Sequence, residues 1–192
     1  MLFYKICYYV GNAIFRIVFR FNVVGKDNMP KEGRVILCSN HISNFDPLIL
    51  GLAVPRKIRF MAKKELFKNK FLNKFLTMLG AFPIDREGAS ISSIKTSLSI
   101  LKNEEVLGIF PEGTRVFKED ITKAKPGIGM ITITGKSPVV PVFINSKYKI
   151  FSKVNIIIGE PLTFDEYYDK KLNKEDYTLI SQNIMRAIYS MK

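Results

Sequence analysis

The sequence contains one histidine, His41, so any imidazole chemistry in this protein takes place there. His41 lies just past a short β-branched run at residues 34–39, which is typical of a buried strand, and Asp46 follows five residues later. In a continuous helix this spacing would turn the two side chains about 140° apart, so they can meet only across a turn. A carboxylate that held one ring nitrogen would fix the tautomer and stabilise the cation formed when the other nitrogen accepts a proton.

The residues that follow His41 predict such a turn. Asp46 and Pro47 are typical of the N-cap and first position of a helix, which we expect over residues 47–54. An N-cap carboxylate still has a second oxygen with which to hold the imidazole. The alternative is a loop histidine beside a capping aspartate, which would carry no chemistry.

A second loop, Phe-Pro-Glu-Gly-Thr-Arg at residues 110–115, carries groups that suit an anion. Gly113 lets the backbone approach a ligand, and the N–H groups around it could form an anion-binding nest. Arg115 presents a planar fork to a phosphate. Glu112 would orient Arg115 or contact a substrate hydroxyl, because a carboxylate is a poor ligand for a phosphate. The alternative is an ordinary surface turn.

A third loop adds another cation. Arg86 follows a short strand that we expect at residues 82–84, so it would lie at the carboxyl end of that strand. The alternative is a salt bridge between Arg86 and the neighbouring Asp85 or Glu87, which is the ordinary role of an arginine beside acids.

These loops connect elements of two alternating kinds. Short apolar runs predict strands at 34–39, 57–62, 82–84, 106–110, 139–144 and 154–158. Helix-like stretches lie at 47–54, 69–79, 90–102, 127–134, 164–169 and 174–190. Strands separated by helices predict a single α/β domain with a mixed, mostly parallel sheet flanked by helices. Ligands bind beyond the carboxyl ends of the strands in such sheets, which is where the three loops would meet.

The first 21 residues are apolar and aromatic, with Lys5, Arg16 and Arg20 as their only charges. The uncharged stretch at residues 6–15 is about half of what a bilayer crossing needs, and no small-residue cleavage site follows it. We expect an amphipathic interfacial helix over 1–21 and the α/β domain over 22–192. The alternative is a helix packed on the core. The apolar face would comprise Phe3, Cys7, Val10, Ile14, Ile17 and Val18, continued by Phe21.

Composition points to an anionic partner. Thirty Lys and Arg against 17 Asp and Glu give a net charge of +13, which suits nucleic acid, a lipid surface or an acidic protein. The cations are scattered and no nucleic-acid motif is present, so we expect no nucleic-acid partner. Cys7 and Cys38 are the only cysteines, which favours a reduced, intracellular setting.

Four blocks of the sequence together resemble the glycerolipid acyltransferases. They are Asn40-His41 with Asp46, Phe-Pro-Ile-Asp-Arg at 82–86, Phe-Pro-Glu-Gly-Thr-Arg at 110–115 and Val-Pro-Val at 140–142. Residues 62–67 are also similar, so the resemblance covers over half of the chain, and the 110–115 block is its most specific part. The best match is the bacterial 1-acyl-glycerol-3-phosphate acyltransferase family. The hydrophobic N-terminal part is short for that family, which favours a monotopic arrangement over a spanning segment.

The resemblance implies transfer of a fatty acyl group from acyl-carrier protein or acyl-coenzyme A to the 2-hydroxyl of lysophosphatidic acid, giving phosphatidic acid. His41 would be the general base and Asp46 its partner, without an acyl-enzyme. The acceptor phosphate would be held by Glu112, Gly113, Thr114 and Arg115. Arg86 would supply a second cation, and Lys63 is a weaker candidate. No metal or cofactor is expected, because no cluster of metal-ligating residues is present.

The same resemblance implies a peripheral or monotopic enzyme at the cytoplasmic face of the cell membrane, where anionic headgroups attract a basic protein. Three alternatives stay open. The acceptor could be glycerol-3-phosphate or another lyso-lipid, the chain could be a membrane-bound scaffold without activity, or it could be a basic nucleic-acid-binding module.

Overall fold

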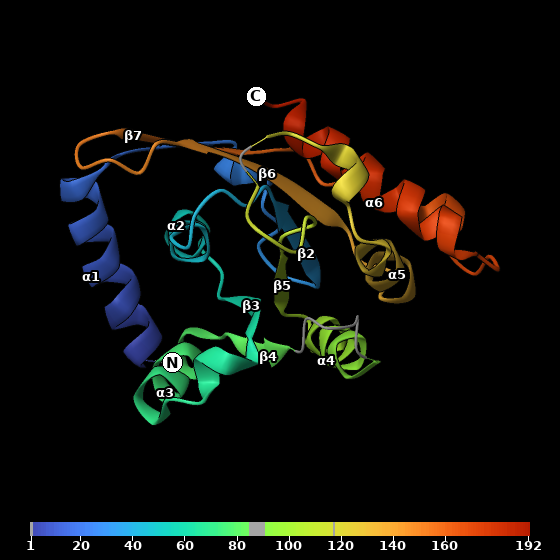
Figure 1. Cartoon of the computed structure of the whole chain (residues 1–192), viewed down its shortest axis with the longest axis horizontal. Helices are drawn as coiled ribbons and strands as arrows, with labels where there is room; N and C mark the ends of the chain where they lie inside the picture. Colours follow the sequence, from blue (N-terminus) through green and yellow to red (C-terminus); the bar gives the residue numbers. More distant parts are fainter. Residues whose placement is uncertain (1, 85–90, 117) are drawn as a thin grey trace.

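The computed structural model describes residues 2–84, 91–116 and 118–192. Within these ranges the chain forms a seven-stranded sheet with the order β1-β7-β6-β2-β5-β3-β4 (Figure 1). All neighbouring strands are parallel except β6 and β7, which are antiparallel, so the predicted mixed, mostly parallel sheet is confirmed. The strands are β1 Arg20–Val24, β2 Val35–Ser39, β3 Ile58–Lys63, β4 Phe82–Ile84, β5 Val106–Ile109, β6 Val139–Ser146 and β7 Lys153–Ile158.

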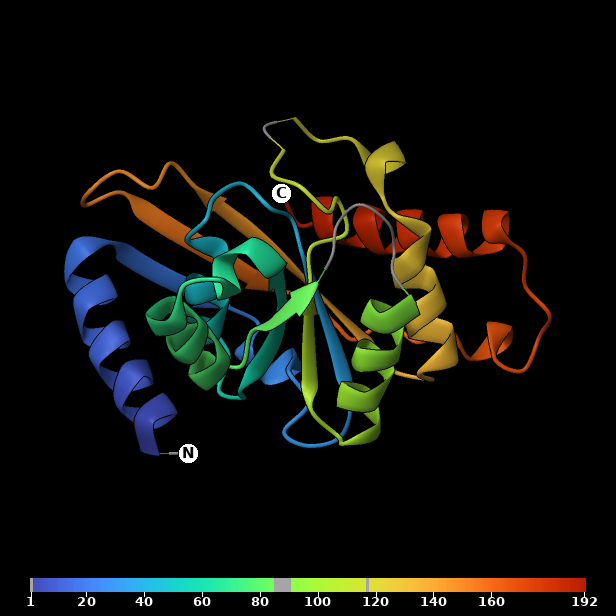
Figure 2. The same cartoon turned by 60° about the horizontal axis from the view of Figure 1, so that its bottom comes forward.

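Helices cover both faces of this sheet (Figures 1 and 2). The α-helices in the described residues are α1 Leu2–Val18, α2 Asp46–Ala53, α3 Lys70–Leu79, α4 Ile91–Lys102, α5 Pro126–Thr134 and α6 Lys174–Tyr189. Ile36 and Cys38 of β2 pack in one core with α4, α5 and α6, whereas Val35 and Leu37 pack in a second core with α2. Because both faces of β2 are covered, its residues form a continuous apolar run, which is why this strand is evident in the sequence.

The observed elements lie within two residues of the predicted ones, with one exception at the start of the chain. We expected the first helix to include Phe21, and this was wrong. The helix ends at Val18, and residues 20–24 form the edge strand β1, which pairs with β7. The partner strand is far along the chain, so local periodicity carries no sign of the pairing. The short segment predicted as helical at 164–169 contains a 3₁₀ turn, Asp165–Tyr167.

The first helix packs through one face and exposes the other. Gly11 contacts Leu52 at the end of α2, where an added Cβ would lie 3.0 Å from the leucine Cδ2. The opposite face of α1 is apolar and between 51% and 72% exposed, at Ile6, Tyr9, Val10, Ile14 and Ile17. Among the described helices, none is both long enough and apolar enough to cross a bilayer. The division into segments 1–21 and 22–192 stays a prediction.

Candidate active site

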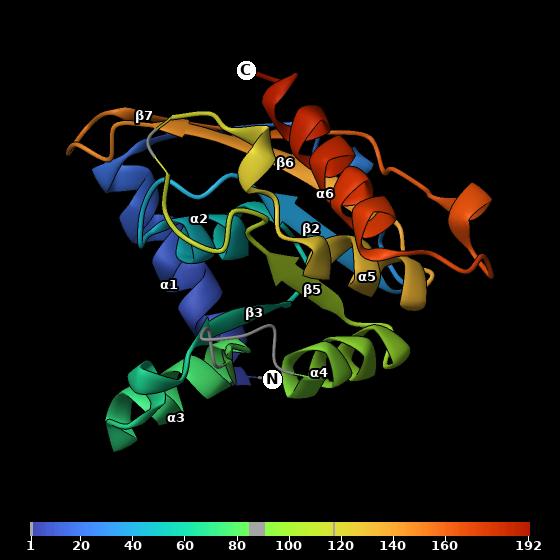
Figure 3. The same cartoon turned by 45° about the vertical axis from the view of Figure 1, so that its right-hand side comes forward.

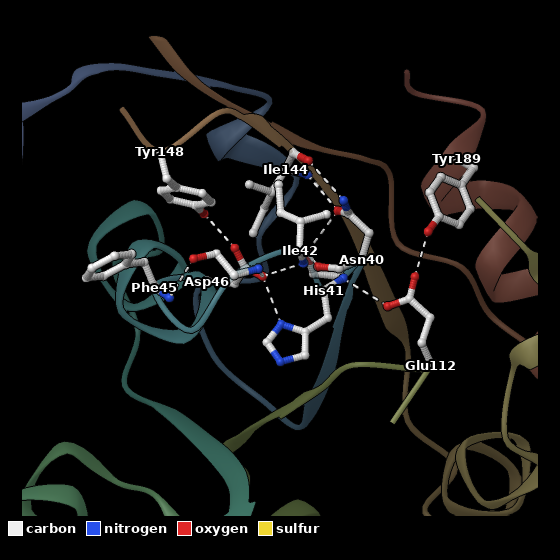
Figure 4. Close-up of polar contacts among 11 residues, drawn as sticks. Asn40, His41, Ile42, Phe45, Asp46, Glu112, Ile144, Tyr148 and Tyr189 are labelled. Carbon is white, nitrogen blue, oxygen red and sulfur yellow. Dashed lines mark hydrogen bonds and ion pairs between the residues drawn. The ribbon is translucent and has the colours of Figure 1, made fainter. Parts of the chain in front are cut away.

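Three neighbouring parallel strands deliver the loops of the site to one edge of the sheet (Figure 4). Cys38 of β2 is in register with Ile109 of β5, and Ser39 is in register with Val142 of β6. The loops that follow these strands therefore begin side by side. They carry His41, Glu112 and Tyr148, and the polar contacts among them form the site.

Asp46 holds the imidazole of His41 as the sequence predicted, although it does so from a different helix position. The His41 Nδ1 donates to Asp46 Oδ2 at 2.8 Å. Asp46 is not the N-cap of α2, because Phe45 occupies that position and Asp46 is the first helical residue. Its carboxylate turns back to the preceding loop, where Oδ2 also accepts the backbone N–H groups of Ile42 and Ser43, each at 2.7 Å.

The second carboxylate oxygen of Asp46 has a partner that the sequence analysis missed. The Tyr148 hydroxyl donates to Asp46 Oδ1 at 2.5 Å. Burial, together with the neighbouring carboxylate, raises the pKa of Tyr148 well above its ordinary value, so the phenol keeps its proton and remains a donor. Asp46 is fully buried, and hydrogen-bond donors from this chain replace the water that its two oxygens would otherwise bind.

This arrangement defines the proton positions on His41. Because a carboxylate only accepts, Nδ1 of the ring carries a proton and the neutral imidazole leaves Nε2 as its acceptor. No described residue forms a hydrogen bond with Nε2, which points away from Asp46 (Figure 4). The ring stacks on Phe110 with centroids 4.1 Å apart, and the His41 side chain is 11% exposed. His41 therefore presents Nε2 as its basic nitrogen, while the bond to Asp46 and the stack on Phe110 hold the ring in place.

The turn at residues 112–116 is joined to the main chain of His41. Glu112 is 1% exposed; its Oε2 accepts the His41 N–H at 2.9 Å and its Oε1 accepts the Tyr189 hydroxyl at 2.6 Å. The Val116 N–H donates to the His41 carbonyl at 2.8 Å. The sequence analysis expected Glu112 to orient Arg115 or to contact a substrate hydroxyl, whereas in the structure one carboxylate oxygen binds the His41 loop and the other binds Tyr189 at the end of α6.

Burial is also the main influence on the ionisation of Glu112. It raises the pKa of this carboxyl above the usual range, and the hydrogen bonds from Tyr189 and from the His41 N–H oppose the rise. Burial, followed by the bond to Glu112, raises the pKa of the Tyr189 phenol. Tyr189 therefore remains the donor of this pair near neutral pH.

The other predicted acceptor-binding residues lie at the surface beside this network. Gly113, Thr114 and Arg115 are exposed, and Gly113 has a φ of +68°, which a residue with a side chain rarely adopts. Within the described ranges, Arg115 has no ion pair or hydrogen-bonded partner. Lys63 ends β3 and is exposed as well. Arg86 lies outside the described residues.

Asn40 continues the sheet beyond β2 with its side chain. Its amide nitrogen donates to the Ile144 carbonyl at 2.9 Å, and its amide oxygen accepts the Ile144 N–H at 2.8 Å. The amide thus replaces a peptide group opposite β6 and anchors the residue next to His41. The sequence signal for Asn40 was its place in the first acyltransferase block, but Tyr148 and Tyr189 had no such signal. Among the described residues, no group of three or more His, Cys, Asp or Glu side chains gathers as a metal site would.

The chain is similar to known proteins over most of its length. The acyltransferase family model matches residues 20–145, a range that contains both His41 and the 110–115 turn. The protein is therefore an α/β acyltransferase, in which the histidine and the exposed arginine turn share one sheet edge.

The more specific assignment comes from individual relatives. The chain is 39% identical over 165 residues to the 1-acyl-sn-glycerol-3-phosphate acyltransferase of Bacillus subtilis. This alignment covers 83% of this chain and 82% of that protein. It is 32% identical to the enzyme of the same name from Streptococcus pneumoniae, over 82% of this chain and 61% of the relative. The crystal structure of the 1-acyl-sn-glycerophosphate (LPA) acyltransferase PlsC from Thermotoga maritima superposes with a TM-score of 0.74 at 26% identity, over 98% of this chain and 79% of that one. The chain belongs to the 1-acyl-sn-glycerol-3-phosphate acyltransferase family.

Proposed function

We propose that this protein transfers a fatty acyl group from an acyl thioester to the 2-hydroxyl of 1-acyl-sn-glycerol-3-phosphate, which produces phosphatidic acid. The names of its relatives in Bacillus subtilis and Streptococcus pneumoniae support the acceptor. The observation that carries the chemistry is the geometry of His41, whose Nδ1 is held by the buried Asp46. An alcohol needs such a base, because its own pKa is far too high for it to ionise near neutral pH.

In the proposed reaction, His41 Nε2 takes the proton of the acceptor hydroxyl as the oxygen attacks the thioester carbonyl. The C–O bond forms, and the carbonyl oxygen becomes negatively charged. When this intermediate collapses, the C–S bond breaks, and the imidazolium returns its proton to the departing thiolate. Asp46 stabilises the imidazolium between the two steps, with Tyr148 and two backbone N–H groups keeping the carboxylate in place.

Direct transfer without an acyl-enzyme is part of this proposal. It is supported by the surroundings of the ring, because no described serine or cysteine forms a hydrogen bond with His41. Cys38 is fully buried, and burial raises the pKa of its thiol, which disfavours a nucleophilic thiolate. Cys7 lies on α1.

The exposed turn beside His41 would hold the acceptor phosphate. Its backbone N–H groups near Gly113 and Thr114 and the Arg115 guanidinium suit an anion, and the Val116 bond to His41 keeps this turn next to the base. Lys63 and Arg86 would supply further positive charge. Glu112 would act on the acceptor indirectly, because its bond to the His41 N–H joins this turn to the loop that carries the base.

The enzyme would work at a membrane surface without crossing it. The exposed apolar face of α1 and the net charge of +13 support peripheral or monotopic attachment to an anionic lipid surface. The free thiols of Cys7 and Cys38 suit the cytoplasmic face. Acyl-carrier protein or acyl-coenzyme A would be the donor there.

The test is an acceptor comparison with the purified protein and a long-chain acyl thioester. Release of free thiol is followed with lysophosphatidic acid, glycerol-3-phosphate and lysophosphatidylcholine, and the lipid product is identified by mass spectrometry. We expect phosphatidic acid from lysophosphatidic acid as the fastest reaction. Faster acylation of glycerol-3-phosphate would replace the proposed acceptor, and no acylation of any acceptor would refute the function.

Direct transfer has its own measurement. The protein is incubated with the thioester in the absence of acceptor, and its intact mass is recorded. An unchanged mass is expected. A mass increase of one acyl group that disappears when acceptor is added would show a covalent intermediate and contradict this mechanism.

A further inference from the structure

Helix α3 exposes most of the apolar face that a surface helix would normally bury. In Lys70–Leu79 the apolar residues recur at three- and four-residue intervals, so they form one stripe. No residue of α3 is buried. The Phe71 side chain is 88% exposed, Phe75 is 44% exposed and Leu72 is 38% exposed. These three side chains are therefore exposed, and no residue of α3 belongs to either hydrophobic core.

The helix is nevertheless well defined at both ends. The Asn69 side chain accepts the N–H groups of Phe71 and Leu72, and Gly80 ends the helix with a φ of +101°. An added Cβ at Gly80 would lie 2.9 Å from the Ile58 carbonyl oxygen, so this stop is tied to β3. These caps define the two ends of α3, and the close approach of Gly80 to Ile58 keeps the end of the helix beside β3.

The polar flank of the stripe is basic. Lys68, Lys70 and Lys74 are exposed, and none of the three forms an ion pair with a described residue. Glu65 is the only acid between residues 63 and 79. Aromatic side chains bordered by lysines are typical of helices that insert shallowly among anionic lipid headgroups.

The stripe also lies at the same end of the molecule as α1. The beginning of α1 packs beside α3 (Figures 1 and 2), and Lys57, just before β3, places its Nζ 5.6 Å from the centre of the Tyr4 ring. Two adjacent helices therefore expose apolar side chains, and they come from parts of the chain about fifty residues apart.

We propose that α3 is a second membrane-binding element, which inserts Phe71, Leu72 and Phe75 into an anionic bilayer while Lys68, Lys70 and Lys74 contact its headgroups. This deepens the proposed attachment through α1 and rests on that proposed function. Two helices that insert side by side would restrict the orientation of the domain on the surface more than α1 alone. The site edge would then meet lyso-lipid acceptors in a constant position.

A tryptophan probe tests this directly, because the natural sequence has no tryptophan. The variant Phe71→Trp places the only indole on α3. Its matched control, Leu179→Trp, places one at a 45% exposed position of α6, a helix that lies on the other side of the molecule from α3 (Figure 3). With phosphatidylcholine vesicles containing phosphatidylglycerol, we expect a blue-shifted emission and quenching by brominated acyl chains for Phe71→Trp only.

A second pair of variants measures how much the natural aromatic residues of α3 contribute to vesicle binding. Phe71→Ser with Phe75→Ser should weaken vesicle binding by roughly 100-fold, about tenfold for each lost phenyl group. Ile91→Ser, at a 72% exposed position on α4, should leave it unchanged. Both proteins should keep wild-type thiol release with a short-chain lysophosphatidic acid dissolved as monomers. Loss of that activity in all proteins, wild type included, would instead contradict the proposed function.

Three results would overturn the proposal. The first is vesicle binding by wild type with no change in the emission of Phe71→Trp, which would leave α1 as the membrane contact. The second is undiminished binding of the double serine variant. The third is an emission shift with acyl-carrier protein in the absence of vesicles but none with vesicles, which would assign the α3 stripe to an acidic protein.

Discussion

Tyr148 and Asp46 are joined by a 2.5 Å hydrogen bond from the phenol to Oδ1, although the two residues are 102 positions apart in the sequence. The bond leaves Oδ2 to His41 and to two backbone N–H groups. A buried carboxylate is stable only when donors replace its lost water. Tyr148 therefore belongs to the support of the base, and it connects the loop after β6 to the loop after β2.

Tyr148→Phe should lower kcat and leave both KM values close to those of wild type. The variant keeps the ring but removes the donor, so an oxygen of Asp46 is left without its partner at a cost of about 1–3 kcal/mol in the free energy of unfolding. We expect kcat to fall roughly tenfold, as the aspartate holds the imidazole less firmly. Tyr177→Phe, at a half-buried tyrosine whose hydroxyl has no described hydrogen bond, is the control. A large rise in either KM would assign Tyr148 to substrate binding instead.

His41→Ala should abolish most activity in a folded protein. The hydrogen bonds that join His41 to Glu112 and Val116 come from its main chain, so alanine preserves them. Removing the general base should reduce kcat by about 10²–10⁴-fold, while circular dichroism and thermal unfolding confirm that the fold persists. A variant that kept more than a tenth of the wild-type rate would show that another group takes the hydroxyl proton.

Glu112→Gln should make the protein more stable than wild type by a margin that grows with pH. Burial raises the pKa of Glu112 in the folded state, so folded protein holds this proton more tightly than the unfolded chain does. Wild-type stability accordingly falls as the pH rises from the ordinary glutamate value through the raised one. Glutamine does not titrate; its oxygen can accept the His41 N–H and its NH₂ group can donate to the Tyr189 oxygen. Denaturant unfolding at several pH values measures the difference, and a constant margin would contradict the raised pKa.

The activity of the same variant separates two roles of Glu112. If the residue acts by joining the loops, Glu112→Gln keeps most of its kcat/KM, whereas Glu112→Ala loses much of it because His41 and Tyr189 both lose an acceptor. If the carboxylate contacts a substrate hydroxyl, which was one of the two roles expected from the sequence, the glutamine variant should lose activity as well. Steady-state kinetics on the two variants decides between them.

Arg115→Ala should raise the KM for lysophosphatidic acid without changing stability. Arg115 is exposed and has no described partner within the protein, so its removal should alter the free energy of unfolding by less than about 0.5 kcal/mol. One lost charge-assisted hydrogen bond to phosphate corresponds to a roughly tenfold or greater increase in KM. The KM for the thioester and the rate with a monoacylglycerol, which has no phosphate, should not change. Lys118→Ala, three residues away and also exposed, is the matched control.

An equal loss with the phosphate-free acceptor would remove the phosphate role from Arg115. An equal rise in the KM for lysophosphatidic acid in Lys118→Ala would show that general positive charge, rather than the position of Arg115, attracts the lipid. Raising the salt concentration distinguishes these cases further, because it screens a diffuse attraction more strongly than a direct contact.

The sequence by itself determined the features that depend on near neighbours. The alternation of buried strands and helices was evident from apolar runs such as residues 35–38, which are apolar throughout because both faces of β2 are covered. The turn after His41 was also predicted, and such a turn is what allows the side chains of His41 and Asp46, five residues apart, to meet. The place of Arg115 in a glycine-containing turn at the end of a strand was also evident from the sequence.

Only the tertiary structure decided which distant groups complete these local ones. Tyr148 bonds to Asp46, and Tyr189 bonds to Glu112 across 77 positions, while β1 pairs with β7 from the opposite end of the sequence. Glu112 lies in a motif that suggests a ligand contact, yet its carboxylate is buried between the His41 loop and the end of α6. The physical reason is common to all four residues and both strands. A hydrogen bond depends on distance in space, and the folded sheet, rather than any local pattern of residue types, brings these donors and acceptors together.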